Sequence, residues 1–303
     1  MAKISRLESK LNSCLEDGYF YEAHQIYRTL YYRLCSQEKW KELLNLLYEG
    51  ALRLLEVNEV VSAIDLAELF VEVLVKFETC ISSDVVSRLE QLFSRIPASL
   101  EEEDPSTNKV DKRSNFLSSA LKWSMKVSDK KRYRAKGHPS LHRIFGMRLW
   151  QEGNYQAARN HLILCDDTEK FALFLIDFQQ KCGFDSEKDL FIVQAVLQLL
   201  CQRRPKTAAV LLQQYCIEHP KISGEPPYQL PLLNFAWLLT LSVQTKKLEF
   251  FTILVERYEH SIKRDNEYRI YLDKIGQIYF GLPPPNKSTN SNGLLGNIFR
   301  GEL

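Results

Sequence analysis

Apolar positions recur every three or four residues along most of this 303-residue chain. That spacing places them on one face of an α-helix, and no stretch alternates polar and apolar residues over the length of a strand. The pattern predicts about fourteen helices joined by short connections. The expected helices cover residues 3–16, 20–35, 38–56, 59–77, 83–95, 112–127, 138–152, 154–165, 167–182, 186–202, 204–217, 231–243, 246–259 and 261–280.

Two copies of a helix-pair signature indicate how these helices pack. In each copy an aromatic residue follows a glycine by two positions and a small alanine follows it by five. The copies are Gly18, Phe20, Ala23 and Tyr27, and Gly153, Tyr155, Ala158 and Leu162, with Gly146 at the small position of the preceding helix. Small residues let two antiparallel helices approach closely. The sequence therefore predicts an all-α, right-handed α-solenoid of tetratricopeptide-like (TPR-like) helix pairs, with an irregular all-α bundle as the alternative.

Three segments interrupt the helical pattern. Residues 97–115 carry the acidic run 101–104, residues 126–136 carry six basic side chains, and residues 219–231 carry five prolines and glycines. Proline and glycine exclude a continuous helix from the third segment, which predicts a Pro-rich loop or hairpin. Such a loop is either a binding element or a longer connection between helices.

These interruptions divide the chain into three expected parts. They are the N-terminal half of the solenoid at 1–136, the C-terminal half at 137–282 and a flexible tail at 283–303. The tail starts with three prolines, continues with Asn, Ser and Thr, and then carries a small apolar patch at 294–299. That composition indicates disorder with a docking motif, or simple fraying of the chain end.

Composition agrees with an extended helical array. Glycine (12) and proline (11) together make about 8% of the chain, against an average of about 12%, so helix-breaking residues are scarce. Apolar residues at 45% exclude a disordered chain. A net charge of only +2 argues against a protein that tracks nucleic acid over its whole surface.

Compartment signals favour the cytosol. The seven cysteines are dispersed without any C-x-x-C pair, which fits neither a disulfide framework nor a zinc site. The N-terminus lacks the apolar core of a signal peptide. The longest apolar stretch, 230–243, is shorter than the roughly 20 residues that a membrane span needs. We expect a reduced, soluble, cytosolic protein without direct membrane insertion.

No catalytic motif stands out. The chain has neither a Gly-rich phosphate loop after a strand nor a G-x-S-x-G nucleophile turn. His138 and His142 are four positions apart, as in a metal-binding pair, but no Glu follows the first histidine and no third ligand lies nearby. A structural role for these histidines is the simpler interpretation, so we expect no enzyme activity, no metal and no cofactor.

Charged surfaces carry more information. Asp65, Glu68 and Glu72 form an acidic stripe at i, i+3 and i+7 on the otherwise apolar helix 59–77. The stripe is either a solvated face or an electrostatic docking strip for a basic partner. The basic run 126–136 either contacts RNA or an acidic partner, or is a solvated, mobile loop; it lacks interleaved aromatic residues beyond Tyr133.

A series of short strings then identifies a family. In chain order they are Tyr21-Glu22-Ala23-His24-Gln25, Arg28-Thr29-Leu30, Gly50-Ala51-Leu52, Ala120-Leu121-Lys122-Trp123-Ser124, Gly137-His138-Pro139, Gln194-Ala195-Val196-Leu197, Pro231-Leu232-Leu233-Asn234-Phe235, Tyr271-Leu272-Asp273 and Gly293-Leu294-Leu295-Gly296-Asn297. Together they resemble the Golgi-to-ER traffic protein 4 family, the 35-kDa subunit of the transmembrane-domain recognition complex. The resemblance runs from about residue 6 to the end, and it favours the animal branch.

The resemblance implies a cytosolic α-solenoid adaptor that is not an enzyme. Such a protein acts in post-translational targeting of tail-anchored membrane proteins to the endoplasmic reticulum and in quality control of hydrophobic clients. Its implied partners are the targeting ATPase on the N-terminal half, and a BAG-domain chaperone regulator and a ubiquitin-like adaptor protein on the C-terminal half, with no nucleic acid. The alternative is a helical-repeat solenoid that binds RNA or another protein.

The resemblance also implies site residues. Acidic ATPase-contacting positions of the family align with Asp65 and Glu72, and Glu68 completes the stripe. A basic position of the fungal members aligns with Ser36, and Arg33 lies one turn before it. Expected contacts of the C-terminal half are Ile222, Tyr228 and Leu230 in the Pro-rich loop, with Phe235 and Tyr271 in the last helices.

Overall fold

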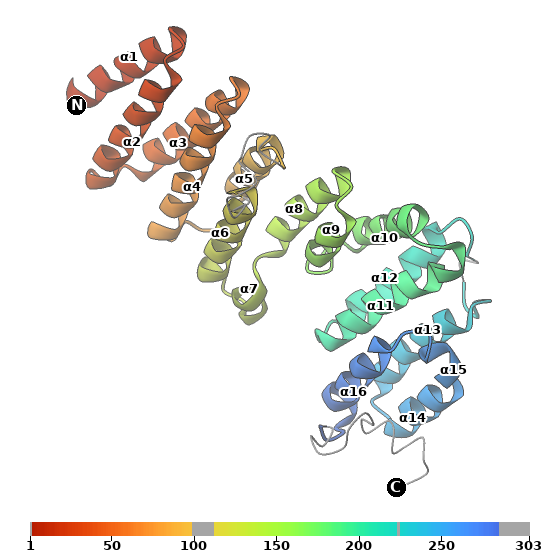
Figure 1. Cartoon of the computed structure of the whole chain (residues 1–303). Helices are drawn as coiled ribbons and strands as arrows, with labels where there is room; N and C mark the ends of the chain where they lie inside the picture. The colour runs from red at the N-terminus through yellow and green to blue at the C-terminus, as the bar shows by residue number, and fades with distance from the viewer. Residues whose placement is uncertain (1, 99–111, 223–224, 285–303) are drawn as a thin grey trace, which may run out of the picture. The chain divides into compact units, whose positions relative to one another are not determined.

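A computed structural model describes residues 2–98, 112–222 and 225–284 of the chain, and all regular structure in these ranges is helical (Figure 1). The all-α prediction is confirmed. The helices of the described ranges are α1 (Ala2–Glu16), α2 (Phe20–Ser36), α3 (Trp40–Glu56), α4 (Val60–Lys76), α5 (Ser83–Arg95), α6 (Lys112–Val127), α7 (Lys131–Lys136), α8 (Pro139–Gln151), α9 (Tyr155–Leu162), α10 (Thr168–Cys182), the 3₁₀ turn η1 (Asp185–Glu187), α11 (Lys188–Cys201), α12 (Pro205–Glu218), α13 (Pro231–Thr245), α14 (Leu248–Arg257), α15 (Glu259–Ile262) and α16 (Glu267–Phe280).

Two helices differ from the expected pattern. The prediction of a loop across the basic run was wrong, because residues 131–136 form the short helix α7, none of whose residues is buried. A helix without an apolar face gives no periodic signal. The single helix expected at 261–280 is also divided. Helix α15 ends at Ile262 and α16 begins at Glu267, whose backbone N–H donates a hydrogen bond to the carboxylate of Asp265 at 2.8 Å in the turn between them.

The first compact unit covers Met1–Cys165. Its helices pack mainly as neighbours, α1 on α2, α3 on α4 and α8 on α9. The predicted boundary after residue 136 falls inside this unit, because α8 also contacts α5 and α6. The partition of partners between the two predicted halves remains a prediction.

Similar offsets along the chain relate equivalent helices of this unit. Hydrogen bonds join α2 to α4 across 41 residues and α3 to α5 across 43. Helices joined at the same offset at two points run parallel, as equivalent helices of successive repeats do. The offset exceeds the 34 residues of a tetratricopeptide repeat and lies nearer to the longer helical repeats.

The predicted glycine signature is confirmed at both of its turns. Gly18 and Gly153 have φ values of +78° and +76°, in the left-handed region that favours glycine. A Cβ on Gly146 of α8 would lie 2.8 Å from the side chain of Leu162 on α9. This glycine therefore permits the close crossing of α8 and α9 that the sequence predicts.

The second unit covers Asp166–Leu303 and is described to residue 284. Its central element is α11, which contacts α10, α12, α13 and α16. Polar bonds join α11 to α16 and to the turn before it. Asp189 pairs with Arg264 of that turn, Gln198 donates to the Tyr271 hydroxyl, and the Tyr279 hydroxyl donates to the carbonyl of Leu200. These partners are 73 to 79 residues apart in sequence.

The other interrupting segments lie partly or wholly outside the described residues. Residues 219–222 and 225–230 connect α12 to α13 without regular structure, so the expected Pro-rich loop is confirmed over its described part. The acidic run 101–104 and residues 285–303 of the predicted tail lie outside the description. None of the described helices is both long and apolar enough to cross a membrane.

Candidate protein-interaction sites

The acidic stripe of α4 lies beside α2 and is bonded to it. The Nε2 atom of His24 lies 2.7 Å from Oδ2 of Asp65, and Arg28 lies 3.4 Å from the other carboxylate oxygen. The hydroxyl of Tyr31 donates a hydrogen bond to Glu72 at 3.0 Å. The stripe is therefore one wall of a polar network between two helices rather than a row of isolated acids.

The network changes the electrostatics of the stripe. Burial, followed by the hydrogen bond to the Glu72 carboxylate, raises the pKa of Tyr31 well above its usual range, so this hydroxyl stays protonated and remains a donor. Asp65 is partly buried beside His24 and Arg28 of α2, and the Arg28 guanidinium offsets its charge. The acidity that faces solvent comes from Glu68 and Glu72, both exposed.

Two tyrosines extend this site in a way that the sequence analysis missed. Tyr21 and Tyr32 are 71% and 63% exposed, and they share a row of α2 with Arg28 at i, i+7 and i+11. Because Arg28 contacts Asp65, the row adjoins the acidic stripe. We call the surface formed by Tyr21, Tyr32, Val61, Glu68 and Glu72 the α2–α4 face.

Arg33 occupies another side of α2. At about 100° per residue it is rotated by roughly 140° from Arg28 and roughly 200° from Tyr31. The structure therefore brings Asp65 and Glu72 into one network but puts Arg33 away from the row that contacts α4. Its contact with the targeting ATPase stays a prediction.

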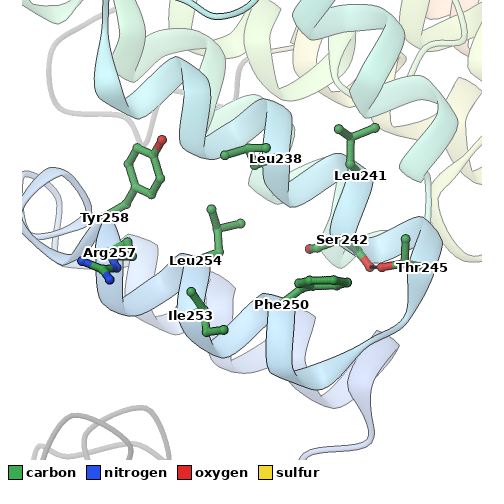
Figure 2. Close-up of a pocket in the computed structure, with 9 residues that line it drawn as sticks. All are labelled: Leu238, Leu241, Ser242, Thr245, Phe250, Ile253, Leu254, Arg257 and Tyr258. Carbon is green, nitrogen blue, oxygen red and sulfur yellow. Dashed lines mark hydrogen bonds between the residues drawn. The ribbon is translucent and has the colours of Figure 1, made fainter.

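The second candidate site is an apolar groove between α13 and α14, with a volume of about 410 Å³. Figure 2 shows Leu238 and Leu241 on one wall, Phe250 and Ile253 on the other, and Leu254 between them. Phe250 and Ile253 are 53% and 55% exposed, although large apolar side chains usually find cover in a folded chain. We call this surface the α13–α14 groove; its lining residues are Leu238, Leu241, Ser242, Thr245, Phe250, Ile253, Leu254, Arg257 and Tyr258.

The polar groups inside the groove are already bonded within the helix. The hydroxyl of Ser242 donates to the carbonyl of Leu239 at 2.9 Å, and that of Thr245 donates to the carbonyl of Ser242 at 3.0 Å. Two cationic side chains lie at the groove. Arg257 is part of its lining, and the Lys247 ammonium lies 5.4 Å from the centre of the Phe250 ring. The groove therefore suits an apolar ligand without buried charge.

Polar bonds fasten the Pro-rich loop at both ends. At its start, His219 Nε2 and Gln179 Oε1 lie 3.2 Å apart, and Lys221 pairs with Asp185 at 2.9 Å. At its end, the Asn234 side chain accepts a bond from the backbone N–H of Tyr228 and donates one to its carbonyl. Burial lowers the pKa of His219, which favours the neutral ring.

The five residues expected to contact a partner do not share one surface. Tyr228 and Phe235 are buried, and the Phe235 ring lies 5.8 Å from that of Tyr258, which lines the groove. Ile222 and Leu230 are half-buried in the loop. Tyr271 is half-buried on α16, where its hydroxyl accepts a bond from Gln198 and donates one to Glu267. We assign Tyr228 and Phe235 to support of the loop and the groove; a partner contact for the others remains a prediction.

The exposed basic helix α7 is a third charged surface. Lys126, just before it, pairs with Glu78 at 3.2 Å, and Lys130 and Arg132 lie over the Tyr133 ring. Tyr133 is the one aromatic residue of α7, and cations already lie over its ring, which leaves little aromatic surface on this helix for stacking of nucleobases. Binding of RNA or an acidic partner here stays a prediction.

The histidine pair considered for a metal has a structural setting. His142 Nδ1 lies 3.0 Å from Nδ1 of His161, and its Nε2 lies 2.7 Å from the carbonyl oxygen of Lys136. His138 instead caps α8 by accepting a bond from the backbone N–H of Ser140. Within the described ranges, no group of three or more His, Cys, Asp or Glu side chains could hold a metal ion.

Comparison with known proteins identifies the family of this chain. The model of the family described as Golgi to ER traffic protein 4 matches residues 37–299. The chain belongs to this family. A Golgi to ER traffic protein 4 homolog of Oryzias latipes is 42% identical over 295 residues, which cover 97% of this chain and 86% of that protein. The homolog of Homo sapiens is 42% identical over 296 residues, covering 97% and 85%.

A solved structure supports the architecture of the Golgi to ER traffic protein 4 family for this chain. The crystal structure of C. therm. Get4 covers 98% of this chain and matches it with a TM-score of 0.80 at 24% identity. That identity supports the fold alone. The resemblance in the short strings, including that to animal members, is confirmed, and the family match spans both walls of the α13–α14 groove.

Proposed function

We propose that this chain is a non-enzymatic cytosolic adaptor in Golgi-to-ER traffic, acting in post-translational targeting of tail-anchored membrane proteins to the endoplasmic reticulum. Membership of the Golgi to ER traffic protein 4 family supports the pathway. Two separate surfaces support the adaptor role, because an adaptor must contact at least two partners. They are the α2–α4 face in the first unit and the α13–α14 groove in the second.

The exposed groove is the observation that carries the proposal. A groove between two helices, with apolar walls and satisfied polar groups, matches the recognition of an amphipathic helix. We assign it to a segment of a BAG-domain chaperone regulator or of a ubiquitin-like adaptor protein. The loop at 219–230, fixed by Tyr228 and Asn234, would provide a further contact for the same partners.

The α2–α4 face would serve the targeting ATPase. It combines exposed carboxylates at Glu68 and Glu72 with the exposed rings of Tyr21 and Tyr32. Tyrosine supplies large contact area at low conformational cost, and the carboxylates select a basic partner and speed encounter with it. Binding of both partners to one chain raises their effective concentration to the order of millimolar, which promotes transfer and quality control of hydrophobic clients without chemistry.

Paired surface substitutions test the two sites separately. Ile253→Asp puts a charge into the groove and should lower binding of the regulator and the ubiquitin-like partner at least about tenfold, because the charge would have to be buried. Ile270→Asp is the matched control, since Ile270 is 67% exposed on α16 outside the groove. Co-purification from cytosol with quantitative mass spectrometry measures both. Full retention of partners by Ile253→Asp would refute the groove assignment.

Charge reversal tests the other face. Glu68→Lys with Glu72→Lys should weaken ATPase binding, and the loss should shrink as salt rises because exposed charges are screened. Glu90→Lys is the control on the exposed surface of α5. Titration calorimetry at low and high salt measures the effect. If the double variant and the control bind the ATPase with equal affinity at low salt, the acidic stripe is only a solvated face and not a docking strip.

A further inference from the structure

The described chain ends close to α14, one of the two helices that form the α13–α14 groove. Helix α16 finishes at Phe280, whose ring stacks on Phe251 of α14 with centroids 4.6 Å apart. Just beyond, Leu282 packs so closely on Gly276 that a Cβ there would lie 2.7 Å from it. Phe251 adjoins Phe250, a wall residue of the groove. The described part of the chain therefore ends close to the helix that forms one wall of the groove, and residues 285–303, which we call the C-terminal segment, follow from this point in the sequence.

The C-terminal segment contains a ligand of suitable chemistry. Residues 293–299 carry no charge, and four of the seven are large and apolar: Leu294, Leu295, Ile298 and Phe299. We call these four side chains the apolar patch. Their spacing of i, i+1, i+4 and i+5 would place them within roughly 140° of one helix face, which is the pattern of anchors for a groove between two helices.

The linker between the fold and the patch is long enough. Nine residues lie between Pro284 and Leu294, so ten Cα–Cα steps connect them, and these residues are mainly polar. A flexible chain of that length has a root-mean-square span of about 18 Å and a maximum of about 33 Å. An α-helix with its side chains is about 10–12 Å across, so the patch can pass around α14 and reach the groove.

We propose that the α13–α14 groove binds the apolar patch of this chain's own C-terminal segment. The groove offers Phe250, Ile253 and Leu241 to an uncharged apolar ligand, and its own hydroxyls need no partner. Attachment through a short linker gives the patch an effective concentration on the order of millimolar. The inference rests on the proposed function only in that both use this groove, and a partner would then have to displace the patch.

A peptide competition in full-length protein tests this inference. A fluorescent peptide with the sequence of residues 290–303 is titrated by anisotropy with the native chain and with the variant Leu295→Asp/Phe299→Asp, whose own patch cannot dock. The variant should bind the peptide at least about tenfold more tightly, because its groove is open. Equal affinity for both chains, or no binding to either, would overturn the proposal.

Two further variants locate the binding site of the peptide. Adding Ile253→Asp to the patch variant should abolish peptide binding, whereas adding Ile270→Asp should leave it unchanged. Circular dichroism confirms that each variant keeps its helices. Loss of binding in both, or in neither, would place the peptide elsewhere and overturn the assignment to the groove.

Sedimentation velocity distinguishes the chain's own patch from that of a second copy. The native chain should remain monomeric across a hundredfold concentration range. A dimer that dissociates on Leu295→Asp/Phe299→Asp would show that a second copy occupies the groove, which contradicts docking within one chain. No cytosolic partner takes part in these measurements, so their outcome is independent of whether Ile253→Asp loses partners in co-purification.

Discussion

His142 of α8 and His161 of α9 face each other with their Nδ1 atoms 3.0 Å apart. Since Nε2 of His142 lies 2.7 Å from the carbonyl oxygen of Lys136, that nitrogen carries a proton and donates it. The Nδ1 of neutral His142 is therefore the acceptor, and Nδ1–H of His161 is the donor. One hydrogen bond between two neutral rings thus joins the helices, and a second proton between the facing nitrogens would remove it.

The pair predicts a loss of stability in mild acid. Burial lowers the pKa of His161 from 6.5 to about 4, and burial lowers that of His142, with the charges of Lys136 and His138 acting in the same direction. The unfolded chain then binds more protons than the folded chain below pH 6.5. The free energy of unfolding should fall between about pH 6.5 and 4, by about 3 kcal/mol from His161 alone. Urea denaturation across this range measures it.

Substitution of His161 tests whether this side chain causes the decline of the free energy of unfolding in mild acid. His161→Gln keeps a polar side chain but removes the titrating group, so the decline with pH should flatten. The control is His260→Gln, at an exposed position of α15, and its free energy of unfolding should depend on pH as that of the native chain does. An undiminished slope in His161→Gln would show that other groups cause the decline.

The two kinds of glycine in the helix pairs should respond differently to alanine. Gly146→Ala forces a Cβ to 2.8 Å from Leu162 and should cost about 1–3 kcal/mol by separating α8 from α9. Gly153→Ala meets nothing within 4 Å, so only its left-handed φ of +76° opposes the change, at about 1 kcal/mol. Leu162→Ala should offset part of the first loss and none of the second, as double-mutant cycles in urea will measure.

Tyr31→Phe should separate stability from binding on the α2–α4 face. The change removes the hydrogen bond to Glu72 and should lower the free energy of unfolding by about 0.5–1.5 kcal/mol. ATPase affinity should not fall, because the carboxylate keeps its charge and its exposure. Tyr32→Phe, at a ring that is 63% exposed, is the control for stability. An equal loss of stability in both variants would mean that the bond contributes nothing.

The Arg264–Asp189 pair should be the strongest single polar contact between α11 and the turn that leads into α16. Asp189 is 1% exposed, so Arg264→Met leaves a buried carboxylate without its partner and should cost about 3 kcal/mol. Asp189→Asn added to it should recover much of that loss. Lys263→Met breaks only the exposed pair with Glu259 and should change stability by less than about 1 kcal/mol. Denaturation of these three variants and the native chain is the measurement, and an Arg264→Met chain as stable as the native chain would contradict a buried role for the pair.

Helix positions could be predicted from sequence because each helix of a solenoid buries an apolar face against near neighbours. The exceptions have local causes that periodicity does not record. Helix α7 has no buried face at all, and the division before α16 lies at a turn in which the carboxylate of Asp265 accepts a local hydrogen bond. Gly146 could be placed at a helix crossing because close approach leaves room only for a small residue.

The sites were only partly predictable. The acidic stripe was visible because carboxylates are unusual on an apolar helix. Its partners His24 and Tyr31 are 41 residues away, and their register depends on how α2 packs on α4. The groove was missed because apolar residues such as Phe250 give the same periodic signal whether or not another element covers them. The burial of Tyr228 likewise depends on its bonds to Asn234.

The contacts of α11 with residues much later in the chain also determine how long α11 stays without its partners during synthesis. Within the first unit, α2 finds its bonds to α4 about 41 residues later, but Asp189 must wait 75 residues for Arg264. At about 5–20 residues per second, a ribosome leaves that carboxylate and the apolar α11 without α16 for about 4–15 seconds. The second unit therefore spends the longer time as an incomplete nascent chain, and premature termination before α16 exposes apolar residues of α11 to the protein quality-control machinery of the cell.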